Sequence, residues 1–127
     1  MSWEILVVDD EQGYRDMFTY ILESAGIKIT CVENGEEAVK KVKEKAFDLI
    51  LTDVHMPKLT GPEAVKIIKK IRPEQKIIVF SSSSDPEHQL EKKSEEYGII
   101  DCLYKPVELA DLERVLKQAL GPTLQLT

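Results

Sequence analysis

Short apolar runs alternate with longer stretches of mixed polarity along the whole chain. The first run holds four consecutive apolar residues, Ile5 to Val8, which is typical of a parallel strand buried on both faces. Later runs of similar length are separated by turn residues such as Asn34-Gly35. The strands predicted on this basis are 3–8, 27–32, 47–52, 77–80 and 99–104.

The stretches between these runs have the spacing of amphipathic helices. After the first strand, large apolar residues recur three and four positions apart from Tyr14 to Ala25, so they share one helix face. Pro62 suits the first turn of a later helix, and Pro73 ends it. The helices predicted in this way are 14–25, 36–46, 62–71, 86–97 and 109–120.

Five strands alternating with five helices predict an α/β protein with a doubly wound (βα)5 parallel sheet. The first, third and fourth strands are the most apolar and should be interior, whereas 27–32 alternates apolar and polar residues as an edge strand does. These assignments favour the flavodoxin-like strand order 2-1-3-4-5. They also place Cys31 and Cys102 on opposite edges, where no disulfide can join them.

Composition narrows the class of protein. The chain of 127 residues carries 17 Lys and Arg against 23 Asp and Glu, a net charge of −6 that argues against a nucleic-acid-binding surface. No apolar run approaches the roughly 20 residues of a membrane span, and the N-terminus lacks a signal-peptide pattern. We therefore expect a cytoplasmic protein with no direct nucleic acid or membrane binding. We also expect one domain over 1–121, followed by a short C-terminal tail, 122–127.

Side chains that can bind ligands or react follow four of the strands. Asp9 and Asp10 end the first strand, Asp53 the third, Ser81 the fourth and Lys105 the fifth. Ligands of doubly wound sheets bind beyond the carboxyl ends of the strands, so this topology predicts that the five side chains converge.

The converging groups indicate phosphoryl chemistry. Neighbouring carboxylates repel one another unless a cation lies between them. A few hard oxygen ligands suit Mg²⁺, which keeps several waters and shares phosphate oxygens. A lysine and a hydroxyl would contact the anionic side of that phosphate, and a carboxylate can itself accept the phosphoryl group.

Taken together, the motifs resemble the response-regulator receiver domain of two-component signalling, as in chemotaxis regulators. The motifs are Val7-Val8-Asp9-Asp10-Glu11, the segment 48–57 with Gly61, and Lys105-Pro106. The resemblance extends over about residues 3–120. It implies a switch that takes a phosphoryl group from a phosphohistidine of a sensor histidine kinase or phosphotransfer protein and then changes a partner-binding surface. Such a domain is not a conventional enzyme, although it promotes its own aspartyl phosphorylation and dephosphorylation.

The resemblance also implies a magnesium site. Asp53, the phosphoryl acceptor, and Asp10 would bind the ion through their carboxylates. His55 would bind it through its backbone carbonyl, and Asp9 through a water molecule.

Two further residues match the positions that contact the phosphoryl oxygens, Ser81 and Lys105. Counting from Ile77 selects Ser81 for the hydroxyl, whereas counting back from Gly98 selects Ser83; we retain Ser81. The resemblance further implies a cis peptide bond after Lys105.

The chain departs from the family pattern at three positions. Cys102 occupies the place where many members have an aromatic residue that rotates inward on phosphorylation, so an aromatic switch is not assigned. Val107 replaces a common phenylalanine, and His55 is an uncommon residue two positions after the acceptor.

Other interpretations use the same residues. Asp9 or Asp10 alone could cap the first helix, and Asp53 alone could be a turn residue. An aspartyl-nucleophile phosphatase acting on external phosphate esters is the alternative function. That class pairs two aspartates around one residue, and here His55 takes the second place. The joint spacing favours the switch.

Overall fold

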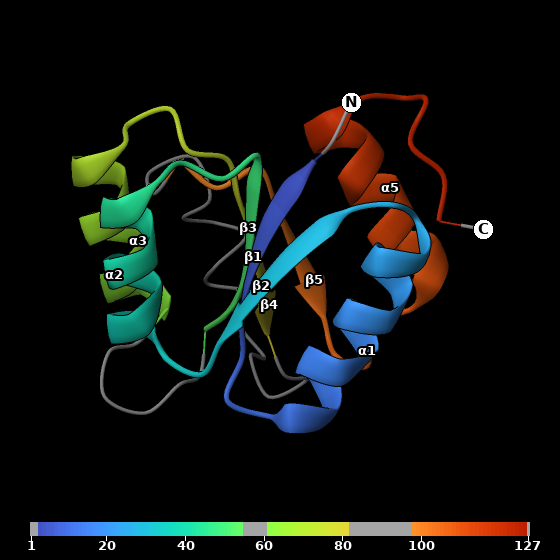
Figure 1. The fold of residues 1–127 in the computed structure, drawn as a ribbon, viewed down its shortest axis with the longest axis horizontal. Coiled ribbons are helices and arrows are strands. Elements are labelled where there is room, and N and C mark those ends of the chain that lie inside the picture. Colours follow the sequence, from blue (N-terminus) through green and yellow to red (C-terminus); the bar gives the residue numbers. More distant parts are fainter. Residues whose placement is uncertain (1–2, 55–60, 82–97, 127) are drawn as a thin grey trace.

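The protein is described by a computed structural model that covers residues 3–54, 61–81 and 98–126. A central sheet lies between two layers of helices (Figure 1). Its strands are β1 (Glu4–Val8), β2 (Lys28–Val32), β3 (Leu49–Asp53), β4 (Ile77–Ser81) and β5 (Asp101–Tyr104). The helices are α1 (Gln12–Ser24), α2 (Gly35–Glu44), α3 (Gly61–Ile71) and α5 (Leu109–Leu120). The helix predicted at 86–97 lies outside the described residues.

All neighbouring strands are parallel, and their order is β2-β1-β3-β4-β5. The predicted strand order is therefore confirmed, as are the interior positions of β1, β3 and β4. Cys31 in β2 and Cys102 in β5 lie on opposite edges, and both are free thiols. No described helix has the length and apolar character needed to cross a membrane.

Alternation along the strands divides the core into two clusters. Ile5 and Val7 point to the face covered by α1 and α5, whereas Leu6 and Val8 point to the face covered by α2 and α3 (Figure 1). Every residue of β3 and β4 is buried. Burial of apolar surface on both faces accounts for the continuous apolar runs of these strands.

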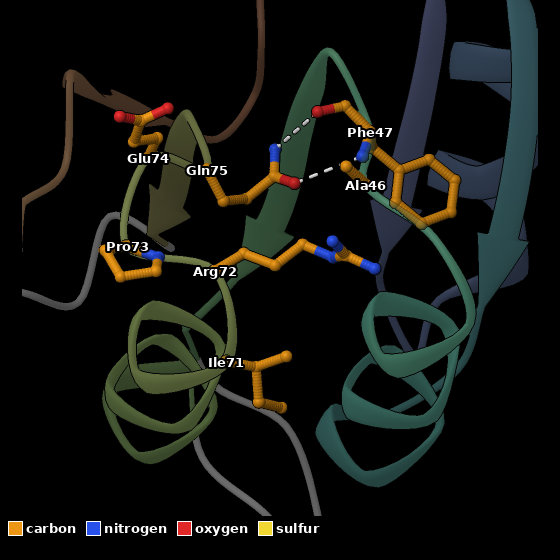
Figure 2. Close-up of a pocket in the computed structure, with 7 residues that line it drawn as sticks. All are labelled: Ala46, Phe47, Ile71, Arg72, Pro73, Glu74 and Gln75. Carbon is orange, nitrogen blue, oxygen red and sulfur yellow. Dashed lines mark hydrogen bonds between the residues drawn. The ribbon is translucent and has the colours of Figure 1, made fainter.

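We call the side where the strands begin the amino edge and the side where they end the carboxyl edge. At the amino edge, the buried side chain of Gln75 joins two loops (Figure 2). Its Oε1 accepts the Phe47 N–H at 3.1 Å, and its Nε2 donates to the carbonyls of Phe47 at 2.8 Å and Lys76 at 3.1 Å. These bonds take the place of strand pairing at Phe47, so β3 begins at Leu49 rather than at the predicted residue 47.

The fifth strand is also shorter than predicted, since it begins at Asp101 rather than at residue 99. After α5, the backbone of Gly121 turns with a φ of 123°. The following residues fold back over the core cluster on the α1–α5 face. Leu124 is buried there, and the Leu126 N–H donates to Glu113 Oε2 at 3.0 Å.

Candidate functional site

The backbone ladder of the sheet holds the candidate residues at the carboxyl edge. The Asp9 N–H donates to the Val32 carbonyl at 3.2 Å, one residue beyond β1. The Lys105 N–H donates to the Ser81 carbonyl at 2.8 Å, one residue beyond β5. Asp53 is the last residue of β3. Parallel strands that end at one level thus place side chains from distant segments around a common space.

Three carboxylates meet in that space. One oxygen each from Asp9, Asp10 and Asp53 lie within 4.8 Å of one another, and we call these residues the acidic cluster. Asp9 is fully buried and Asp53 is 4% exposed, whereas Asp10 is exposed to solvent. The cluster is therefore closed on its protein side and open at Asp10.

Among the described residues, one ammonium group, that of Lys105, faces the cluster. Lys105 Nζ lies 3.0 Å from Asp9 Oδ2 and 3.0 Å from Asp53 Oδ2, and its third carboxylate neighbour is Glu11 Oε1 at 3.8 Å. The lysine side chain is only 10% exposed. Burial acts to lower the pKa of Lys105, but the negative charges of Asp9 and Asp53, together with the hydrogen bond to Asp53, outweigh it and raise the pKa above its usual range. The group stays charged at neutral pH.

The two oxygens of Asp9 have different surroundings. Oδ1 accepts the Glu11 N–H at 2.9 Å. Oδ2 is buried and, within the part of the chain that the structure describes, receives no donor in hydrogen-bond geometry, although Lys105 Nζ is near enough for an ion pair. Burial raises the pKa of the Asp9 carboxyl despite the lowering effect of Glu11 and Lys105. A buried acceptor without a donor fits a site for a cation.

The donor set is the one that Mg²⁺ prefers. All three members of the acidic cluster offer carboxylate oxygen, a hard ligand, and their number is too small to enclose an ion completely. Exposed Asp10 leaves space for the waters that Mg²⁺ retains. The residues present therefore fit a hydrated magnesium ion.

The structure brings together Asp9, Asp10, Asp53 and Lys105, as the topology predicted. Ser81, fully buried, ends β4 beside them. His55 and Ser83 lie outside the described residues.

Neither Asp9 nor Asp10 is the N-cap of α1. The N-cap residue of α1 is Glu11, whose own side chain makes no capping bond. Asp9 Oδ1 receives the N–H of that N-cap residue, so the buried aspartate does help to begin the helix. One oxygen of Asp9 serves this local role, and the other faces the cluster.

Two residues around the site were not singled out from the sequence. Tyr14 was assigned only to the apolar face of α1, yet Lys105 Nζ lies 4.2 Å from the centre of its ring. Arg15 Nη1 donates to the Asp9 carbonyl at 2.8 Å, and its Nη2 lies 3.6 Å from Glu33 Oε1. Their position in the sequence could have indicated a place near the site, because both residues lie in the first turns of the helix that follows Asp9 and Asp10.

A pocket at the opposite, amino edge is lined by residues of the α2–β3 and α3–β4 loops (Figure 2). Arg72 borders it, and its Nε donates to the Val42 carbonyl at 2.8 Å. Gln75 also lines this pocket, with its side-chain amide bonded to backbone groups. The charged groups of this pocket do not converge as those at the carboxyl edge do.

Known proteins resemble this chain over nearly its whole length. The chemotaxis protein CheY of Thermotoga maritima is 36% identical over 109 residues, which cover 85% of this chain and 89% of that protein. The transcriptional regulatory protein ZraR of Klebsiella oxytoca is 32% identical over 120 residues, 94% of this chain. The chain spans only 27% of the length of that regulator.

Solved structures show the same fold. The receiver domain of a Pseudomonas aeruginosa sensor histidine kinase, with a magnesium ion coordinated in its active-site cleft, matches with a TM-score of 0.80 and 26% identity. The match covers 95% of this chain and 99% of that one. The family model described as the response regulator receiver domain matches residues 5–117. The chain belongs to the response regulator receiver domain family.

Proposed function

We propose that this receiver domain accepts a phosphoryl group on Asp53, with Mg²⁺ held beside it by the acidic cluster. The observation that carries the proposal is the meeting of three carboxylates within 4.8 Å, with the buried Lys105 ammonium 3.0 Å from two of them. A divalent cation and an ammonium together can neutralise the charge on the oxygens of a phosphoryl group. A histidine kinase or a phosphotransfer protein would supply that group from a phosphohistidine.

In the proposed step, a carboxylate oxygen of Asp53 forms a bond to the phosphorus atom of the donor. The bond between phosphorus and the donor's leaving atom breaks, the leaving group takes the electron pair, and an acyl phosphate remains on Asp53. Bound Mg²⁺ would supply positive charge at the phosphoryl oxygens. Asp9, Asp10 and Asp53 would hold the ion, together with the backbone carbonyl of His55.

Lys105 and Ser81 would contact the new phosphoryl group. Lys105 Nζ already lies 3.0 Å from Asp53 Oδ2, so a short shift takes it to an oxygen bonded to phosphorus. Ser81 is joined to Lys105 through the backbone, which couples any movement of the two. Receiver domains are phosphorylation-activated signalling switches, and movement of such contacts is how added charge is passed to a partner-binding surface.

Mass spectrometry of intact protein tests Asp53. Wild type incubated with acetyl phosphate and Mg²⁺ should gain one phosphoryl group, and Asp53→Asn should gain none. Asp48→Asn is the matched control, because Asp48 directly precedes β3 and Asp53 ends it. Equal labelling of wild type and Asp53→Asn would exclude Asp53 as the acceptor.

No observation at the site favours the phosphatase alternative. A measurement of phosphate release separates it from the switch. A phosphatase would release inorganic phosphate continuously from an external phosphate ester. A switch accumulates the phosphorylated protein and turns over few donor molecules. Sustained release from a phosphomonoester by wild type, lost in Asp53→Asn, would overturn the switch.

A further inference from the structure

The ring of Tyr14 forms one wall of the space around the Lys105 ammonium. Nζ lies 4.2 Å from the ring centre, well inside the roughly 6 Å over which an aromatic face attracts a cation. We propose that Tyr14 is a positioning residue for phosphoryl transfer, whose ring holds Lys105 against the acidic cluster. This inference rests on the proposed function of Asp53.

The ring is itself held in place by the core. Tyr14 packs against Phe18, with ring centres 6.2 Å apart and planes tilted by 35°. Phe18 stacks on Phe80 of β4, with centres 5.0 Å apart and planes at 16°. Both phenylalanines are fully buried. The aromatic column therefore connects Lys105 to the centre of the α1–α5 face, and it restricts the orientations open to the tyrosine ring.

Tyr14 differs from the other neighbours of Lys105 in its chemistry. Asp9 and Asp53 belong to the proposed magnesium and phosphoryl site, so their oxygens are shared with those groups when the site is filled. Glu11 is 3.8 Å away with a side chain 60% exposed, where water and salt weaken its attraction. The ring is neutral and offers no metal ligand, so its attraction for the ammonium is independent of what the carboxylates bind.

Positioning of this kind matters for a lysine. Its four-carbon side chain has many rotamers, and fixing one of them costs conformational entropy. A ring that selects one arrangement during folding leaves less of that cost to the moment of phosphoryl transfer. Loss of the ring should therefore slow transfer without altering the ligands of the metal.

Two variants of Tyr14 test the role of the ring. Tyr14→Leu removes the aromatic face, whereas Tyr14→Phe keeps it and removes only the hydroxyl. At saturating acetyl phosphate and Mg²⁺, we expect the leucine variant to label roughly 2- to 30-fold more slowly, the range that a cation–π contact implies. The phenylalanine variant should stay within about twofold of wild type. Tyr20→Leu, on the same helix at a residue 77% exposed, is the matched control and should have no effect.

Two further readouts separate positioning from general damage. In metal-free protein, the ε-methylene protons of Lys105 should show an upfield ring-current shift by NMR in wild type and Tyr14→Phe, and lose it in Tyr14→Leu. The Mg²⁺ affinity, measured by titration, should change less than twofold, because the metal ligands are intact. A leucine variant that labels at the wild-type rate, or that loses Mg²⁺ affinity in parallel with rate, would overturn the positioning role.

The NMR measurement also distinguishes the two proposals. Protein that is labelled on Asp53 but shows no ring-current shift at Lys105 would overturn the role of Tyr14 alone. Protein that shows the shift but never takes up a phosphoryl group would overturn the function of Asp53 and leave the ring contact a structural one.

Discussion

Polar side chains at the two edges of the sheet differ in how fully their hydrogen bonds are satisfied. At the amino edge, Gln75 makes three hydrogen bonds to backbone groups, Asp48 Oδ2 accepts the Glu4 N–H at 2.7 Å, and Lys76 Nζ donates to the Ala119 carbonyl at 2.7 Å. Side chains there complete the hydrogen bonding of loops and helix ends.

At the carboxyl edge, the negative charges outnumber their positively charged partners among the described residues. Three carboxylates share one ammonium, and Asp9 Oδ2 is buried without a hydrogen-bond donor among the described residues. Buried groups left in this way lower stability. The side chains of the amino edge thus contribute to folding, whereas those of the carboxyl edge lower stability and remain able to bind a ligand.

Gln75→Ala should cause the largest loss of stability. The substitution removes the partners of the Phe47 N–H and carbonyl and of the Lys76 carbonyl, so the free energy of unfolding should fall by about 3 kcal/mol. Urea denaturation measures this loss. Glu74→Ala, at the exposed neighbouring residue, should stay within about 0.5 kcal/mol of wild type. The labelling rate of folded Gln75→Ala should equal that of wild type; a slower rate would show that the edges are coupled.

Mg²⁺ should stabilise the protein through the opposite edge. At a concentration 100 times its dissociation constant, a ligand that binds only the folded state adds about 2.7 kcal/mol. Thermal unfolding with and without Mg²⁺ measures the gain, and a chelator should remove it. Asp10→Ala should abolish most of the effect, whereas Glu11→Ala should retain most of it. The reverse ranking would refute our assignment of ligands.

Asp9→Asn should stabilise the metal-free protein at neutral pH. A carboxyl group whose pKa is raised by burial costs folding free energy at neutral pH, and the amide removes that cost. Urea denaturation in a chelator provides the measurement. Asp48→Ala is the counterpart at the amino edge and should destabilise, because it removes the acceptor of the Glu4 N–H. If both substitutions destabilise, the proposed difference between the edges is wrong.

Glu113 of α5, outside both edges, should give a small pH-dependent effect on stability. Bonds from the Leu126 N–H and Lys117 hold its pKa below the usual value. A lowered pKa in the folded state contributes stability above the unfolded pKa, and this contribution is lost as the pH falls through the folded one. Glu113→Gln should therefore have a lower Tm than wild type at pH 7, and the difference should vanish in acid. A difference that persists in acid would assign the effect to packing.

Sequence reasoning was most successful where burial controls the pattern. Apolar runs at 5–8 and 49–51 could be predicted as interior strands because both of their faces are covered. The strand order then predicted which side chains meet, so Asp9, Asp53 and Lys105 could be placed together without any contact being visible in the sequence.

Residues whose role depends on distant partners could not be predicted in this way. Tyr14 lies within an ordinary apolar stripe, and its contact with Lys105 depends on the path of the chain after β5. Gln75 lies in a polar loop, yet it is bonded to the backbone of Phe47, which is 28 residues away in the sequence. Neither hydropathy nor local turn signals contain that information.

The packing of Trp3 makes the chain its own optical probe. It is the single tryptophan, and it packs on the α1–α5 face, where it lines a pocket together with Leu124. The carboxyl edge lies at the other end of β1. The fluorescence emission of Trp3 should therefore report unfolding and the docking of the last residues, but it should not change when the acidic cluster binds an ion. Tyr14 lies at that other end, beside Lys105. Trp3, the only tryptophan, can thus be read for the stability of the α1–α5 face without any attached dye.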